Sequence, residues 1–139
     1  MKKLLIPWAA GLMALTIGTF ANAQSGKVDV GKREYEANCI GCHGATGKGD
    51  GPYVEFLKRT PSDLTMLAKA NGGVLPLDRL YNSITGDSVA AHGRDMPVWG
   101  REYRMGAAAH YMEVPYDQEA YVRARVLALL EYINRLQAK

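Results

Sequence analysis

The chain has 139 residues and a formal net charge of +3, a size that suits a single domain. Hydrophobic residues make up 47% of the chain and charged residues 22%, so there are enough apolar side chains for a folded core. The nearly balanced charge provides no basic surface of the kind that nucleic-acid-binding proteins use, and we expect no nucleic-acid partner.

Residues 1–23 have the pattern of a secretory signal peptide. Two lysines begin it, an apolar stretch follows, and its last three residues match the small-x-small cleavage pattern. We expect cleavage after Ala23, which leaves residues 24–139 as one periplasmic domain with no membrane attachment. An uncleaved membrane anchor is the alternative. However, the apolar stretch is short for a membrane span and is interrupted by one proline and two glycines.

The first predicted helix of this domain has Asp29 as its N-cap and runs through Asn38. Apolar or small residues recur on one side of it, at Val28, Gly31, Tyr35 and Cys39. Glycine is unfavourable inside a helix. We therefore expect Gly31 to lie where another backbone or ring approaches closely.

Two cysteines three residues apart are followed at once by a histidine, in the run Cys39-Ile40-Gly41-Cys42-His43. This is the attachment signature of a c-type haem. On one helical turn both thiols can reach the vinyl groups along one porphyrin edge, and His43 can then bind the iron as an axial ligand. A Cys39–Cys42 disulfide and a zinc site are the alternatives. The chain lacks the strand runs of a thioredoxin-like protein and has no further cysteines for zinc.

Residues 44–52 contain four glycines and end in Pro52, a composition that excludes a stable helix or strand. The Walker pattern of a phosphate-binding loop is absent. We expect a tight loop under the haem edge, in which the Pro52 carbonyl accepts a hydrogen bond from the Nδ1–H of His43. Such a bond fixes the tautomer and the orientation of a ligating histidine.

Two short helices are predicted next. The first has Ser62 or Asp63 as its cap and ends at a pair of glycines, and the second covers residues 76–85 and ends at Gly86. The side chains expected to face inward are Leu64, Leu67, Ala68, Leu77, Leu80, Tyr81 and Ile84.

Residues 86–104 have the composition of a loop, and Met96 lies in this segment directly before Pro97. A methionine at such a place is well suited to be the sixth, axial ligand of a haem iron, since thioether ligation is a known haem mode. Simple packing of Met96 is the alternative. Weaker candidates for the same role are Met66, Met105, Met112, His92 and His110.

Residues 103–116 show no clear pattern, and we interpret them as a surface loop that could contact a partner. The last helix is predicted from Asp117 to about Gln137. Its apolar side chains follow one amphipathic face, at Val122, Val126, Leu129, Ile133 and Leu136. Tyr132 lies beside this face, and we expect it to meet Gly31.

Together these features resemble the class I c-type cytochromes, which are small monohaem electron carriers. The resemblance covers nearly all of residues 24–139, and its specific parts are Cys39-x-x-Cys42-His43, Gly51-Pro52, Met96-Pro97 with Trp99-Gly100, and Leu129-x-x-Tyr132-Ile133. It implies an all-α fold of about four helices around one covalently attached haem c, with His43 and Met96 as axial ligands. It also implies that the first and last helices cross where a glycine meets an aromatic ring. The segment between Met96 and the last helix is longer than in the smallest members.

The resemblance implies electron transfer by a monomer that is not an enzyme and that docks transiently with redox partner proteins at the haem edge. A haem c subunit of a periplasmic dehydrogenase or oxidase complex is the alternative, with residues 103–116 as its docking surface. An open-site haem sensor or peroxidase is a third reading, which requires that Met96 does not bind iron.

Overall fold

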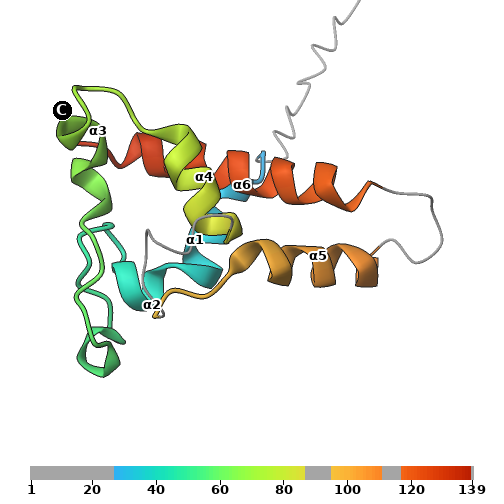
Figure 1. The fold of residues 1–139 in the computed structure, drawn as a ribbon, viewed down its shortest axis with the longest axis horizontal. Coiled ribbons are helices and arrows are strands. Elements are labelled where there is room, and N and C mark those ends of the chain that lie inside the picture. The colour runs from blue at the N-terminus through green and yellow to red at the C-terminus, as the bar shows by residue number, and fades with distance from the viewer. Residues whose placement is uncertain (1–26, 87–94, 111–116, 139) are drawn as a thin grey trace, which may run out of the picture.

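The structure is a computed structural model that describes residues 27–86, 95–110 and 117–138. Across these ranges the chain forms helices and no strand, so the predicted all-α fold is confirmed (Figure 1). The elements are α1 (Val30–Asn38), α2 (Ile40–His43), η1 (Val54–Phe56), η2 (Leu64–Met66), α3 (Leu67–Ala70), α4 (Leu77–Thr85), α5 (Trp99–His110) and α6 (Gln118–Arg135), where η denotes a 3-10 helix. The predicted signal peptide, His92 and Met112 lie outside the described residues.

Aspartate side chains begin the first and last helices. Asp29 Oδ1 accepts from the backbone N–H of Lys32 at 2.9 Å, and Asp117 Oδ1 accepts from that of Glu119 at 2.9 Å. These bonds satisfy N–H groups that have no partner within the helix. The predicted helix starts at Asp29 and Asp117 are therefore confirmed. The predicted end of α4 at Gly86 is also confirmed, because its φ of 91° favours glycine.

The first and last helices pack closely at Gly31, as predicted. A Cβ at this position would lie 1.9 Å from the carbonyl oxygen of Ala128 and 3.0 Å from the Cβ of Tyr132. The Tyr132 ring itself packs on Tyr35, with ring centroids 5.1 Å apart. The glycine thus meets the backbone of α6 and the base of Tyr132, while the aromatic ring contacts a different residue of α1.

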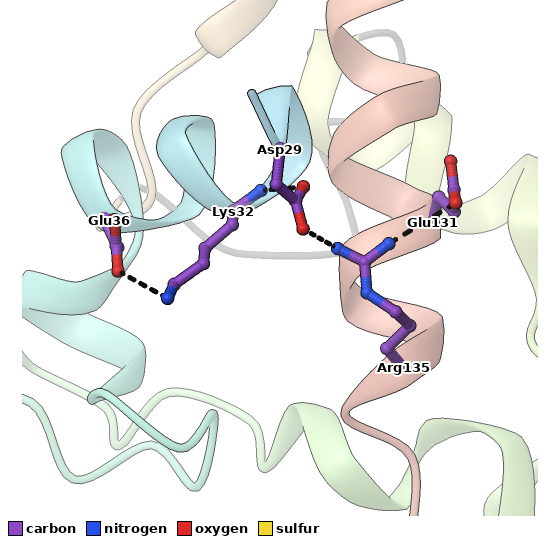
Figure 2. Close-up of polar contacts among 5 residues, drawn as sticks. All are labelled: Asp29, Lys32, Glu36, Glu131 and Arg135. Atoms are coloured by element: carbon purple, nitrogen blue, oxygen red, sulfur yellow. Dashed lines mark hydrogen bonds and ion pairs between the residues drawn. The ribbon is translucent and has the colours of Figure 1, made fainter. Parts of the chain in front are cut away.

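A network of ion pairs joins the same two helices on the outside of the molecule (Figure 2). Arg135 of α6 bonds to Asp29 at the start of α1, and also to Glu131 at 3.4 Å. Lys32 and Glu36 pair along α1 at 3.7 Å. All these side chains are well exposed, so each pair contributes little to stability.

Helix α5 corrects two sequence-based expectations. Residues 99–104 are helical rather than loop, and the surface loop expected over 103–116 is a helix as far as His110. Figure 1 shows α5 running beside α6, and Tyr103 and Ala107 are buried in the core. These two residues follow Trp99 at four-residue spacing, so the helix has an inward face that its glycine and alanine residues obscured.

The core lies where α6 meets α1, α4 and α5. The predicted face of α6 is confirmed, since Val122, Val126, Leu129 and Ile133 are buried. The inward position predicted for Leu77 is wrong, because this residue opens the first turn of α4 and is 52% exposed. In the described ranges, no helix has the length and apolar character needed to cross a bilayer.

The chain after α6 is tied to the segment that contains η2 and α3. Gln137 accepts from the backbone N–H of Ala68 at 2.8 Å and donates to the Leu64 carbonyl at 2.7 Å. The N–H of Ala138 donates to the Thr65 carbonyl at 2.8 Å. These bonds hold residues 64–68, and the loop before them, against the end of α6.

Candidate functional site

Cys39 joins two helices, because it follows α1 and precedes α2. Its N–H donates to the Tyr35 carbonyl at 2.9 Å, and its own carbonyl accepts from the N–H of His43 at 2.8 Å. Both cysteines are free thiols, with Cys39 buried and Cys42 partly exposed. Burial, assisted by the charge of Glu34, raises the pKa of Cys39 to about 12, so its sulfur is protonated at neutral pH.

The glycine-rich loop over residues 44–52 folds back along α2, as the predicted tight loop. The N–H of Gly51 donates to the Cys42 carbonyl at 3.1 Å. A Cβ on Gly51 would lie only 2.4 Å from the carbonyl oxygen of Gly41. Glycine is therefore needed here because the loop backbone touches the backbone of the Cys-x-x-Cys-His turn.

His43 Nδ1 lies 3.2 Å from the carbonyl oxygen of Ser62. A carbonyl can only accept, so Nδ1 carries the proton and the ring lone pair is on Nε2. The predicted acceptor, Pro52, is therefore wrong. The reason is a close contact between segments that no local pattern reveals. A Cβ on Gly49 would lie 2.3 Å from the Pro61 carbonyl oxygen, so the loop packs directly against residues 61–62. This packing brings the Ser62 carbonyl to Nδ1 of His43.

One cavity of about 250 Å³ collects the predicted site residues. Cys39, Cys42, His43 and Met96 all line it, although Met96 is far from the others in the sequence. Most of the remaining lining is apolar and comes from five parts of the fold, with the side chains of Leu57, Leu64, Leu80, Ile84, Trp99, Leu129 and Ile133. Apolar side chains of this kind lower the polarity around a group that the cavity holds.

The other ligand candidates that the structure describes do not join this group. Met105 is 50% exposed on α5, and Met66 is not among the residues that line the cavity. His92, Met112 and the side chain of His110 lie outside the described part of the chain.

Sequence reasoning missed a polar stretch of the cavity wall. Arg59, Thr60 and Ser62 line the cavity, and so does Asp95 beside Met96. Pro61 is the one feature of the sequence that could have indicated this stretch. It is the next proline after Pro52, and it directly precedes Ser62, whose carbonyl oxygen contacts His43.

These side chains fit a haem c. Two free thiols sit at i and i+3 on one turn, next to an imidazole whose Nδ1–H already has an acceptor. A thioether from Met96 lines the same apolar cavity. Thiols, an imidazole, a thioether and a largely apolar pocket are the features that c-type haem attachment and ligation require.

Residues 28–137 match the Cytochrome c family, which accounts for every described helix of the chain. Searches of curated proteins and of solved structures returned no significant match. A match over this share of the chain, together with the Cys-x-x-Cys-His turn on the cavity wall, confirms the resemblance to c-type cytochromes. The chain therefore belongs to the cytochrome c family, and its cofactor is a covalently bound haem c.

Proposed function

We propose that this protein is an exported electron carrier in which His43 and Met96 hold the iron of one haem c. Membership of the cytochrome c family supports haem-based electron transfer. The observation that carries the finer assignment is the single cavity that Cys39, Cys42, His43 and Met96 line together. Ligation by a histidine and a methionine raises the reduction potential of a haem, which suits a carrier.

His43 is oriented before any ligand binds. Its backbone is fixed by the bond to the Cys39 carbonyl at 2.8 Å, and its ring by the contact with the Ser62 carbonyl at 3.2 Å. A hydrogen bond at Nδ1 raises the basicity of Nε2 and sets the ring plane. These contacts support His43 as the proximal ligand.

Met96 is positioned by the residues that follow it. A Cβ on Gly100 would lie 2.5 Å from the Thr85 carbonyl oxygen, and one on Gly86 would lie 2.3 Å from Val98 Cγ1. The segment after Met96 therefore rests directly on the last turn of α4. This packing supports a fixed thioether beside the cavity rather than a mobile side chain.

When bound, haem c supplies a reversible one-electron couple. The side chains of this chain attach it, ligate it and exclude water, and none needs to act as acid, base or nucleophile. We therefore propose a carrier rather than an enzyme, acting as a monomer. Redox partners dock transiently through a small interface at the haem edge, on the side where Cys42 is partly exposed.

We include export of the protein in the proposal because of where its haem is attached. Haem c is attached outside the bacterial cytoplasm, and residues 1–23 have the pattern of a cleaved signal peptide. We propose that the mature protein is periplasmic and begins after Ala23.

Covalent attachment and methionine ligation are tested on protein expressed with the haem-attachment machinery. We expect the haem to resist acid–acetone extraction, whereas extractable haem would refute attachment at Cys39 and Cys42. Met96→Ala should abolish the weak red absorption band of a ferric iron–sulfur bond, lower the potential and let carbon monoxide bind the ferrous form. Met105→Ala is the matched control, since Met105 is half exposed. If only Met105→Ala has these effects, the ligand assignment is wrong.

Purification from the periplasm separates a free carrier from an enzyme subunit. We expect a monomer in size-exclusion chromatography. Stoichiometric co-purification with a dehydrogenase or oxidase would instead favour a haem subunit of such a complex.

A further inference from the structure

A buried carboxylate lies just before the haem-attachment turn. Glu34 of α1 is only 8% exposed. Its Oε2 accepts from Asn38 Nδ2 at 3.2 Å, and its Oε1 accepts from Nη1 of Arg125 on α6. A glutamate is seldom buried so deeply unless it is paired. Nothing in the attachment or ligation of haem uses this group.

The two partners of this ion pair differ in their access to water. The side chain of Arg125 is 34% exposed, compared with 10% for that of Glu34. Its guanidinium also lies 4.8 Å from the centre of the ring of Tyr121, which is in the first turn of α6. Water screens a partly exposed charge more strongly than a buried one. The pair therefore leaves a net negative field toward the interior.

Tyr103 of α5 covers the same cluster without adding a charge. It is 7% exposed, and its hydroxyl lies near Glu34 and Asn38. Burial, together with the charge of Glu34, raises the pKa of Tyr103 well above its usual value, so the phenol stays neutral. The charges of this cluster are those of Glu34 and Arg125.

The field of Glu34 reaches the haem cavity. Asn38, which donates to Glu34, and Cys39 both line that cavity. After burial, the charge of Glu34 is the next cause of the raised pKa of Cys39. Since Glu34 is also the more buried partner of the ion pair, a group attached at Cys39 should experience the field of the anion more strongly than that of the cation.

We propose that Glu34 is a positioning charge that lowers the reduction potential of the haem, and that Arg125 partly offsets it. Ferric iron carries one positive charge more than ferrous iron, so a nearby buried anion favours the ferric state. Reduction adds one electron from a redox partner, and no atom is transferred. This role rests on the proposed electron-transfer function, because it concerns the potential of the same haem.

The test is a redox titration of holoprotein against a mediator of known potential. Glu34→Gln should raise the potential, and Arg125→Gln should lower it. Each should shift the one-electron equilibrium constant by about threefold to tenfold, tenfold being 59 mV. The potential of the double variant should lie above that of wild type and below that of Glu34→Gln, because the double variant loses the anion and also the cation that partly offsets it.

The ion pair between Asp29 and Arg135 provides the matched control (Figure 2). It joins the same two helices, but both side chains are 44% exposed and lie on the outer surface. Asp29→Asn and Arg135→Gln should change the equilibrium constant by less than about twofold, because solvent screens these charges.

Opposite signs for the two single variants are the decisive result, since a merely structural effect has no reason to change sign with the charge removed. Shifts in the same direction, or an Asp29→Asn shift as large as that of Glu34→Gln, would overturn the role of Glu34. If Glu34→Gln yields no holoprotein, the other two variants still test the proposal. The potential of Arg125→Gln should then lie below that of wild type, and the potential of the double variant above it.

Denaturant midpoints of the two oxidation states give a second readout. Glu34→Gln should lower the midpoint of the ferric form more than that of the ferrous form, whereas equal losses would refute an electrostatic role. A haem-loaded protein with no reversible couple would overturn the electron-transfer function itself, while a normal couple that these variants leave unshifted would overturn only the role of Glu34.

Discussion

Replacing Gly31 with alanine should destabilise the protein, although alanine is the better helix former. A Cβ at this position would lie 1.9 Å from the Ala128 carbonyl oxygen and 2.7 Å from its carbonyl carbon. An ordinary C···O contact is about 3.3 Å, so α1 and α6 would have to separate by about 1.4 Å. The atoms in the way belong to the backbone of α6, which cannot rotate aside.

The magnitude follows from two opposing effects. Alanine in place of glycine gains about 1 kcal/mol of helix propensity. Overpacking costs about 1–3 kcal/mol, and the upper end applies because the obstacle is backbone. We therefore expect the free energy of unfolding of Gly31→Ala to fall by about 2 kcal/mol, or roughly 10 °C in Tm. Gly31→Val should lose more, because it adds a branched side chain to the same contact.

The assay is denaturant unfolding of the holoprotein, with Gly106→Ala as the matched control. Gly106 also lies inside a helix, but a Cβ there would have nothing within 4 Å. Gly106→Ala should therefore raise stability by up to about 1 kcal/mol. An unchanged or raised midpoint for both Gly31 variants would show that the helices do not meet at this glycine.

A Tyr132 variant shows which part of α6 the added Cβ meets. Truncation of Tyr132 to alanine keeps its Cβ and leaves the Ala128 carbonyl in place, so it should not rescue Gly31→Ala. Rescue by Tyr132→Ala would mean that the ring, rather than the α6 backbone, is the obstacle.

Three further predictions concern stability. Asp117→Ala should lower the free energy of unfolding by about 1 kcal/mol in denaturant melts, because it removes the N-cap of α6. Leu129→Ala should cost about 2–5 kcal/mol, whereas Leu127→Ala on the exposed side of α6 should stay within about 0.5 kcal/mol. The folded-state pKa of Asp29 is lowered mainly by a hydrogen bond from the backbone N–H of Lys32, and that of Asp63 mainly by a hydrogen bond from the Thr65 hydroxyl. These two ionised carboxylates therefore stabilise the folded protein above their ordinary pKa, and this contribution is lost as pH falls through the folded-state pKa. The Tm of Asp29→Asn should consequently depend less on pH in the acid range than the Tm of wild type.

Local signals in the sequence predicted most of the helices. Asp29 and Asp117 mark helix starts because a carboxylate can satisfy backbone N–H groups within its own turn. The face of α6 is equally local, since one helix period places its apolar residues on one side. The expectation of a loop from residue 103 is wrong as far as His110, because α5 gains its stability from packing Tyr103 and Ala107 against neighbours. A short glycine- and alanine-containing stretch carries little trace of such packing.

The haem-attachment turn could be identified because its chemistry is local. Two thiols and an imidazole within five residues share one helical turn whatever the rest of the chain does. Met96 is a different case, since only the fold brings it to the cavity of His43. The sequence predicted Met96 as a ligand because it directly precedes Pro97 in a loop-like segment. The contact between Val98 and Gly86 is what holds this segment in place.

The sequence by itself predicted the two thiols and the imidazole of the haem-attachment turn, because spacing along one turn decides which side chains can act together. Only the tertiary structure decided their partners. His43 meets the carbonyl of Ser62 rather than that of Pro52, and Gly31 meets the carbonyl of Ala128. Backbone acceptors are present at every residue, so no residue type marks the one that the fold will bring into contact.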